Sequence, residues 1–461
     1  MAISRRRTPR ALDKPRGLRE HLDHLARTSP ARMALLGFAV IILFFTSLLL
    51  LPFAKDGPGR ASVVEALFTA TSATCVTGLS VVDTQNYWTI FGHVVIIVAV
   101  QVGGLGVMTL ASVLGLAVSR HIGLTQRILA ARERGSSLGE LGSLLKGVVI
   151  TSFSVEGVLT VCFFPSFASH GGPFLYSLGH SMFMAVSTFN NAGFIIFHDG
   201  LEWAIGDWLV CIPLILGTMV GAIGFPVVQN IATNWRSPKR WSLNTKITLV
   251  TYMAIWVVAV IGIGLLEWNH AFGSFSFNDK LAATLVHATT PRSTGIAMMD
   301  LSAMSEGTWF FMDGLMFIGA GAASTGGGIK VTTFAVLVLA IFAEARGDRD
   351  TEVYGKRLPP EAIRLAISAA FLGTFLVGAA TMLILELSGL PLSQVLFETI
   401  SAFATCGLTT GITGILPASA QVVLVVLMYL GRVGTMTFAA ALALRSRRRV
   451  IRLPEDQPII G

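Results

Sequence analysis

Eight apolar runs, each long enough to cross a bilayer, set the strongest limit on how this chain can fold. They lie at residues 33–53, 88–118, 147–168, 208–232, 247–268, 309–343, 365–388 and 419–444. Their length and the lack of strict alternation favour helices over barrel strands. The second and sixth runs exceed the bilayer thickness, so they must tilt, break or project into water. We therefore predict an all-α membrane protein with eight transmembrane helices.

The composition agrees with this fold class. Only 13% of the 461 residues are charged, whereas a soluble domain carries about 25%. This excludes a soluble enzyme, a disordered chain and a secreted disulfide scaffold. The net charge of +8 does not indicate a nucleic-acid partner, because membrane proteins accumulate Lys and Arg in their cytoplasmic loops.

The distribution of basic residues predicts the orientation. Of the 34 Lys and Arg residues, 28 lie in segments that alternate between the predicted spans. These segments are 1–32, 119–146, 233–246, 344–364 and 445–461. By the positive-inside rule they face the cytoplasm, and so do both termini. The basic loops and tail could also bind anionic lipids of the bilayer.

The external connections contain a fourfold repeat. After the first, third, fifth and seventh spans, a short apolar segment leads into a polar stretch with one glycine. These glycines, Gly78, Gly193, Gly295 and Gly407, are separated by 115, 102 and 112 residues. Non-helical backbone at membrane depth must line a water-filled cavity or be buried in protein. The pattern predicts four re-entrant pore loops, in four covalently linked helix–pore loop–helix repeats around a pseudo-fourfold pore.

Such loops suit a dehydrated cation, which needs a ring of oxygen ligands that backbone carbonyls can supply. We predict a potassium selectivity filter with K⁺ at the carbonyls near the four glycines. Its residues are Thr74, Cys75, Val76, Thr77 and Gly78; Asn190, Asn191, Ala192 and Gly193; Arg292, Ser293, Thr294 and Gly295; and Ala404, Thr405, Cys406 and Gly407. The alternative is that the glycines only mark close helix contacts. It does not explain why one glycine follows a non-spanning segment in every repeat.

A glycine-rich stretch, IGAGAASTGGGIK at 318–330, interrupts the sixth run. Each glycine costs a helix interior about 1 kcal/mol, so the helix should unwind here. The residues concerned are Gly319, Gly321, Ser324, Thr325, Gly326, Gly327, Gly328 and Lys330. A phosphate-binding loop is disfavoured, because no strand precedes the stretch and its spacing differs from GxxxxGK[ST].

Three charged residues lie near membrane depth. Arg432 falls near the centre of the eighth run, where an arginine costs about 2.5–3.5 kcal/mol, so it should face protein or the pore. It is interpreted either as part of a gate or as an arginine satisfied by backbone carbonyls. Arg292 is expected to anchor its loop rather than to touch ions. Glu156, in the third run, is expected to make a helix-packing hydrogen bond, and the alternative is a functional role of the kind that intramembrane carboxylates often have.

The loops TCVTGL from Thr74 and ATCGL from Ala404, with the features above, resemble the Trk/Ktr/HKT superfamily of potassium transporters, over about residues 33–461. A single span before the first loop is similar to the KtrB-like membrane subunits. The resemblance implies potassium uptake in a bacterial cytoplasmic membrane, often stimulated by Na⁺. It also implies that residues 318–330 and Arg432 form a gate. Because Gly78 stands where sodium-selective plant relatives have serine, potassium is favoured.

The resemblance further implies partners. KtrB-like subunits form homodimers on a cytoplasmic RCK nucleotide-binding ring, a KtrA-like partner. No cofactor is expected in this chain, and any response to ATP or ADP would come through that partner. A secondary transporter for another small cation or solute is the alternative, but such proteins typically use inverted repeats. An enzyme is not expected, because no HExxH motif or Ser/His/Asp set is evident.

The chain is thus expected to divide into six parts. They are a cytoplasmic basic N-terminus at 1–32, repeat 1 at 33–118, repeat 2 at 144–232, repeat 3 at 243–343 with the gating loop 318–330, repeat 4 at 362–444, and a cytoplasmic tail at 445–461.

Overall fold

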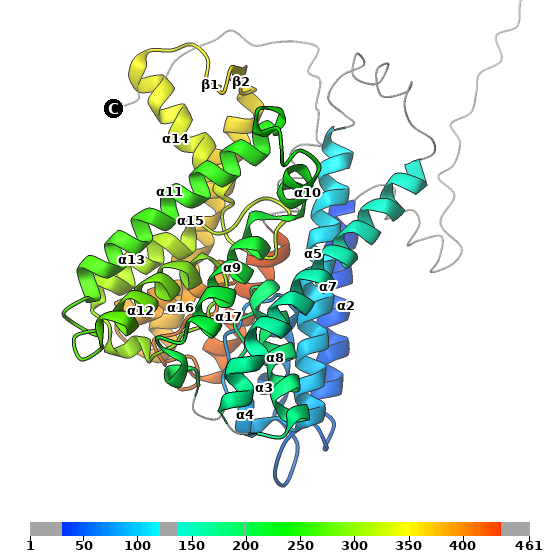
Figure 1. Ribbon diagram of the computed structural model, residues 1–461, viewed down its shortest axis with the longest axis vertical. Helices are drawn as coiled ribbons and strands as arrows, with labels where there is room; N and C mark the ends of the chain where they lie inside the picture. The colour runs from blue at the N-terminus through cyan, green and yellow to red at the C-terminus, as the bar shows by residue number, and fades with distance from the viewer. Residues whose placement is uncertain (1–29, 120–136, 171, 198–199, 435–461) are drawn as a thin grey trace, which may run out of the picture.

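The computed structural model describes residues 30–119, 137–170, 172–197 and 200–434 (Figure 1). In this part of the chain, four helices are long and apolar enough to cross a membrane. They are α5 (Ile90–Ser119), α7 (Ser137–Ser169), α11 (Leu243–Glu267) and α15 (Pro360–Ser388). A bent pair, α9 (Trp208–Ile223) and α10 (Phe225–Thr233), passes the same test only when taken together.

The other elements are shorter. The helices are α2 (Pro30–Leu49), α3 (Val63–Thr74), α4 (Thr84–Tyr87), α8 (Phe174–Phe189), α12 (Phe277–Thr289), α13 (Glu306–Phe317), α14 (Val331–Arg346), α16 (Leu392–Phe403) and α17 (Ala418–Tyr429). Single turns occur at η1 (Glu202–Ala204), η2 (Pro238–Arg240), η3 (Thr290–Arg292) and η4 (Leu301–Ala303), and a π-turn, η5 (Leu430–Gly434), follows α17. The strands β1 (Glu352–Val353) and β2 (Lys356–Arg357) pair antiparallel.

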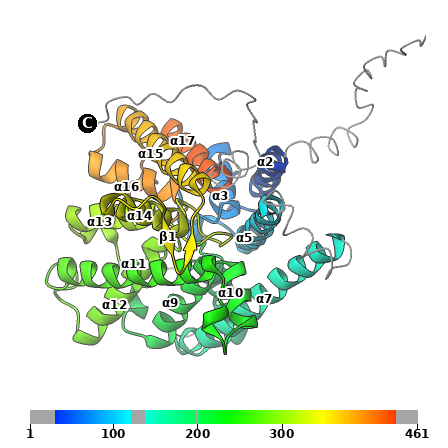
Figure 2. The same ribbon diagram turned by 90° about the horizontal axis from the view of Figure 1, so that it is seen from above.

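The helices surround a common centre in chain order, as the colours in Figure 2 show. The four short helices α3, α8, α12 and α16 lie in the lower half of Figure 1, and α10, β1 and β2 lie at the opposite end. Helix α3 packs between α2 and α5, α8 between α7 and α9, and α16 between α15 and α17. Helix α12 packs against α11 and α9. Each of these four helices is thus held by helices on either side, and its carboxyl end leads into one of the glycine-containing loops.

Local sequence explains where these short helices begin. Ser62 and Glu65 form a capping box at the start of α3, with each side chain accepting the other residue's backbone N–H. Ser276 caps α12 by accepting the N–H of Asp279. Helices α8 and α16 each have a proline at the N-cap, directly before the first helical residue, so its missing N–H removes no hydrogen bond from the helix.

Large apolar side chains cover the outer surface. Ile90, Leu265, Phe371 and Met382 are each more than 70% exposed, and all lie on the long helices. Apolar exposure on this scale would be costly in water, whereas a lipid bilayer accommodates it. These helices therefore present the surface expected of a membrane protein.

The predicted span at 208–232 is not one continuous helix. The run at 208–232 is bent by 97° between α9 and α10. The bend lies at Gly224, whose φ of +90° is left-handed, a conformation that glycine adopts at little cost. A Cβ atom on Gly224 would lie 2.5 Å from the carbonyl oxygen of Ala322, so a distant part of the chain packs against the bend. Helix α9 alone has 16 residues, fewer than the roughly 20 that a span needs.

The sixth run is interrupted as well. Helix α13 ends at Phe317 and α14 begins at Val331, and the residues between them, 318–330, are here called the intramembrane loop.

Several predicted segments lie wholly or largely outside the described residues. These are the basic N-terminus 1–32, the basic segment 119–146, the end of the eighth run and the tail 445–461.

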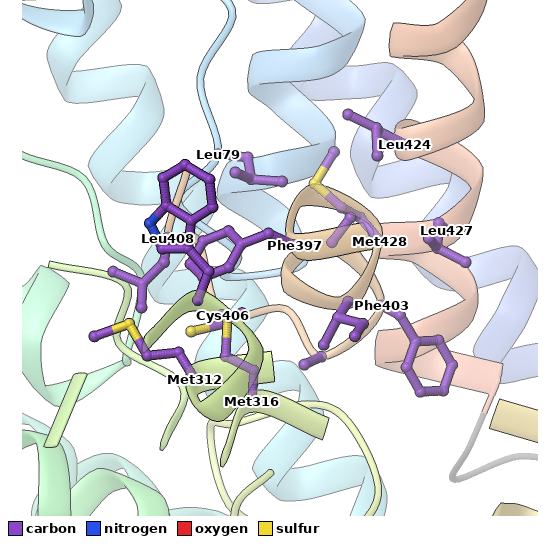
Figure 3. Packing of buried hydrophobic residues seen from close by; sticks show 14 of the residues in the cluster. Leu79, Met312, Met316, Phe397, Phe403, Cys406, Leu408, Leu424, Leu427 and Met428 are labelled. Carbon is purple, nitrogen blue, oxygen red and sulfur yellow. The ribbon is translucent and has the colours of Figure 1, made fainter. Parts of the chain in front are cut away.

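The largest hydrophobic cluster surrounds the fourth glycine-containing loop (Figure 3). Met312 and Met316 of α13 and Phe397 of α16 lie beside Cys406, and the ring of Phe403 lies further away in the same cluster. Residues of α17 and Leu79, from the first loop, complete the same cluster. Side chains from the first, third and fourth repeats therefore share one core, which positions the loops relative to one another.

Candidate functional site

The four glycines form a closed ring. A Cβ atom added to Gly193 would lie 2.6 Å from the carbonyl oxygen of Thr294 and 3.2 Å from the Cα of Gly78. The same relation recurs at the other three: Gly78 faces the carbonyl of Ala192, Gly295 that of Cys406, and Gly407 that of Thr77. Each glycine abuts the residue just before the glycine of the next repeat, and the fourth repeat closes on the first. The ring therefore leaves no room for a side chain at these positions.

The backbone of the four loops shares one unusual conformation. The ring glycines have φ between +66° and +98°. The residues two positions before them, Val76, Asn191, Ser293 and Thr405, also have positive φ. They are four of the six non-glycine residues with this conformation in the described ranges. Left-handed φ is costly for a β-branched residue, and such strain persists where surrounding structure enforces it, often at functional sites.

Hydrogen bonds at the carboxyl ends of α3, α8 and α16 enforce this conformation. The N–H of Thr77 donates to the carbonyl of Ser72 over 2.8 Å, and Ala192 and Cys406 make the equivalent bonds to Ser187 and Ser401. The hydroxyl of Ser72 also accepts the N–H of Gly78 at 3.0 Å. The third repeat differs, because the N–H groups of Ser293, Thr294 and Gly295 all donate to the carbonyl of Thr290.

The intramembrane loop packs against the ring from one side. A Cβ atom on Gly326 would meet the hydroxyl of Ser293, and one on Gly327 would meet the hydroxyl of Thr405. Thr325 bonds to the side chain of Asn191. The loop thus touches the left-handed residue of the second, third and fourth repeats. Together with the ring, it forms one continuous buried site built from all four repeats.

Arg432 lies in the π-turn after α17 and is 1% exposed. Its Nη1 donates to the carbonyl oxygen of Thr325. Its Nε and Nη2 have no hydrogen-bond partner in the described part of the chain. The guanidinium is therefore only partly satisfied by carbonyls, and its one bond ties the fourth repeat to the intramembrane loop.

A sequence model of the TrkH family, described as cation transport protein, matches residues 49–449. The chain belongs to the TrkH family. This confirms the resemblance to the Trk/Ktr/HKT superfamily and agrees with the expectation that the protein is not an enzyme.

This TrkH-family chain is also similar to individual relatives. It is 35% identical to the Ktr system potassium uptake protein B of Bacillus subtilis, over 94% of this chain and 97% of the relative. It is 31% identical to the potassium/sodium uptake protein NtpJ of Enterococcus hirae, over 94% and 98% of the two chains. Its fold matches the potassium transporter TrkH of Vibrio parahaemolyticus with a TM-score of 0.70, covering 89% of this chain and 84% of the other. At 19% identity, that match shows the fold alone.

The structure brings the backbones of all four predicted loops of this TrkH-family protein together but turns the Arg292 side chain away from the ring. Arg292 donates to the carbonyls of Tyr252 and Gly319, at 3.2 and 3.3 Å, and its guanidinium lies 4.1 Å from the centre of the Tyr252 ring. Lys330 Nζ donates to the carbonyl of Gly326 at 2.5 Å. Both cations thus hold the intramembrane loop in place through its own carbonyls.

Glu156 makes a packing hydrogen bond, as expected, but its partner belongs to the second glycine-containing loop. Its Oε1 accepts Asn190 Nδ2 at 3.1 Å, and its Oε2 accepts Gln101 Nε2 at 3.3 Å. Asn190 Nδ2 also lies 3.0 Å from Gln101 Oε1. The carboxyl group is 4% exposed. Helices α5 and α7 of this chain therefore hold the start of the second glycine-containing loop through Gln101 and Glu156.

Replacing Glu156 by Gln should destabilise this support. The change puts an N–H group opposite one of the two amide donors, and a buried hydrogen bond to a charged group contributes about 1.5–3 kcal/mol. We expect a loss of about 1–2 kcal/mol of stability, seen as a lower apparent melting temperature of the purified protein. The matched control is Glu386→Gln on α15, because that side chain is exposed. Equal melting temperatures for both variants and the unchanged protein would contradict the assigned role.

Sequence reasoning missed two kinds of residue in this TrkH-family site. Glu398 of α16 is fully buried and accepts the N–H of Thr410 and the hydroxyls of Thr409 and Thr413, so it fixes the segment after the fourth glycine. A carboxylate inside an apolar half-helix was the available signal. The second kind is a set of glycines in neighbouring helices, each of which packs closely against the carbonyl oxygen of the last residue of a short helix. Gly103 packs against Thr74 at the end of α3, Gly221 against Phe189 at the end of α8, and Gly431 against Phe403 at the end of α16.

Proposed function

We propose that this chain is the pore subunit of a potassium uptake system in a bacterial cytoplasmic membrane. The proposal includes eight transmembrane segments, four re-entrant pore loops and both termini in the cytoplasm. Membership of a cation transport family supports transport. The names of the relatives, a potassium uptake protein and a potassium/sodium uptake protein, support potassium as the main cargo and leave room for Na⁺.

The observation that carries this proposal is the closed ring of four glycines. Each lies in a loop in which the glycine and the residue two positions before it both have positive φ. Four copies of that backbone around one centre can offer a cation a set of carbonyl oxygens in place of its hydration shell. The short helices add the negative ends of their dipoles to the same centre.

The intramembrane loop and Arg432 are proposed as the gate. The loop packs on the ring through small residues, so it would obstruct passage until it moves. Arg432 adds a positive charge on the same side and holds the loop through Thr325. A cation pathway crossed by a buried guanidinium carries an electrostatic barrier, so the two elements would act together.

The assembly is proposed by resemblance to KtrB-like subunits: a homodimer on a cytoplasmic, nucleotide-binding RCK ring, through which ATP or ADP would act. The exposed hairpin of β1 and β2 lies at the end of the molecule opposite the short helices (Figure 1). By the positive-inside rule this end is cytoplasmic. Purification of the full chain with and without the ring, followed by mass measurement in detergent, tests both parts.

Growth of a potassium-uptake-deficient bacterium at low potassium tests the function. We expect the chain, coexpressed with the partner ring, to restore growth and the uptake of potassium and rubidium into whole cells. Uptake of sodium, measured in parallel, tests the selectivity. No rescue despite membrane insertion would refute potassium uptake. Uptake of a larger solute would instead favour the secondary-transporter alternative.

A further inference from the structure

A chain of hydrogen bonds links the ring to the intramembrane loop. Thr294 Oγ1 donates to Asn191 Oδ1 at 2.6 Å, and Asn191 Nδ2 donates to Thr325 Oγ1 at 2.7 Å. Thr325 Oγ1 in turn lies 3.5 Å from the carbonyl oxygen of Phe189. All three side chains have 0% exposure. Each therefore depends on the others for its hydrogen bonds.

These hydrogen bonds join three segments that are distant in sequence. Asn191 is the left-handed residue of the second loop, with φ of +58°. Thr294 directly precedes the third glycine, and its carbonyl abuts Gly193. The Asn191 amide therefore bridges the second and third filter loops at the level of the ring. Its position is set by Thr325, which belongs to neither.

Thr325 is held from two directions. Its hydroxyl accepts a hydrogen bond from the side chain of Asn191, and its backbone carbonyl accepts one from the guanidinium of Arg432. A displacement of the intramembrane loop at Thr325 must break both contacts. The amide of Asn191 would then lose its acceptor inside the protein. A buried donor that loses its partner has a strong tendency to reorient.

The other quadrants of the ring lack such a link. The hydroxyls of Ser293 and Thr405, which occupy the position equivalent to Asn191, have no hydrogen-bond partner within the described ranges. Val76, at the same position in the first loop, has no polar side chain. Among the four left-handed loop residues, Asn191 is thus the one whose side chain connects the ring to the loop.

We propose that Asn191 is a positioning residue that couples the conformation of the intramembrane loop to the ion selectivity of the ring. This inference rests on the proposed function of a potassium pore. While Thr325 stays in place, Asn191 keeps the second and third loops at the spacing that favours potassium. When the loop moves, that restraint is released, and discrimination against sodium falls.

The test measures the ratio of potassium to sodium uptake in cells or in vesicles containing the purified protein. Thr294→Val and Thr325→Val each remove one hydroxyl of the chain and keep the side-chain shape. We expect each to lower the ratio about fivefold or more, the change in an equilibrium that one typical hydrogen bond supports. Thr248→Val is the matched control. It also removes a buried hydroxyl, on α11, but one with no partner among the described residues.

Two further measurements separate coupling from a general disturbance. Thr294→Ser and Thr325→Ser keep the hydroxyl, so we expect both to retain the ratio. The double variant, Thr294→Val with Thr325→Val, should lower the ratio no further than the larger single effect, because both act through Asn191. Multiplying effects in the double variant, or ratios within twofold of the unchanged protein in both valine variants, would overturn the inference. An unchanged protein that takes up no potassium would instead refute the proposed function.

Discussion

Replacing Gly407 by Ala is expected to reduce potassium uptake about a hundredfold or more. The added Cβ would meet the carbonyl of Thr77 and lie 3.1 Å from the Cα of Gly78. Both contacts are with backbone, so no flexible side chain can yield. Overpacking of this kind costs about 1–3 kcal/mol, and left-handed φ in a residue other than glycine costs about 1–2 kcal/mol more. Together they would distort the ring or raise the barrier to ion passage.

Gly411→Ala is the matched control for this variant. Gly411 lies four residues further on and has φ of +90°, close to the +98° of Gly407, but a Cβ there would meet nothing within 4 Å. It therefore carries the conformational cost without the collision. We expect its potassium uptake to stay within about threefold of the unchanged protein. Equal loss in both variants would show that backbone strain, rather than closure of the ring, is what matters. Both chains should be quantified in the membrane by immunoblot.

Replacing Arg432 by Ala is expected to raise the maximal rate of potassium uptake about tenfold. The change removes a positive charge from the proposed pathway and the bond that holds Thr325. The fold should tolerate it, because a buried guanidinium with two nitrogen atoms that lack a partner among the described residues contributes little net stability. The measurement is rubidium uptake at several external potassium concentrations, which separates maximal rate from apparent affinity.

Arg432→Lys separates the two effects of the arginine. Lysine keeps the positive charge but offers a single ammonium group on a flexible stem in place of the planar fork. If the charge forms the barrier, the lysine variant should stay as slow as the unchanged protein. If the bond to Thr325 matters more, its rate should rise towards that of the alanine variant. A maximal rate and an affinity that are both unchanged in Arg432→Ala would rule out a role in gating.

The sequence predicted the features that depend on local composition. Apolar runs mark helices, because the backbone of a segment that crosses a bilayer must satisfy its own hydrogen bonds. The recurring glycine marks the positions at which the packing leaves no space for a side chain. The size of the bend at Gly224 could not be predicted in this way. Gly224 and Pro226 are together a local signal for a break in the helix, but the packing at the bend involves Ala322, almost a hundred residues further on.

The same limit applies to the polar contacts. The recurring glycine predicts a role for the loop backbone, and nothing in the sequence gives the side chain of Asn191 a special meaning. Its role depends on Thr325, 134 residues away. Glu156 was expected to bond within the helix packing, and its contact with Asn190 depends on how α7 lies against α8. Side-chain partnerships between repeats are set by the tertiary arrangement and leave no periodic trace.

The way in which the intramembrane loop is attached limits how it can move. Three backbone hydrogen bonds tie it to the α9–α10 junction: Gly321 N to Ala222 O, Thr325 N to Gly221 O, and Phe225 N to Ala323 O. Side chains from other elements also hold it: Arg432 donates to the carbonyl of Thr325, Arg292 to the carbonyl of Gly319, and Asn191 to the hydroxyl of Thr325. A displacement of Thr325 must therefore break its backbone bond to Gly221 as well as its bonds to Asn191 and Arg432. Because three backbone bonds join the intramembrane loop to the end of α9 and the start of α10, we expect the bend at Gly224 to shift whenever the loop does.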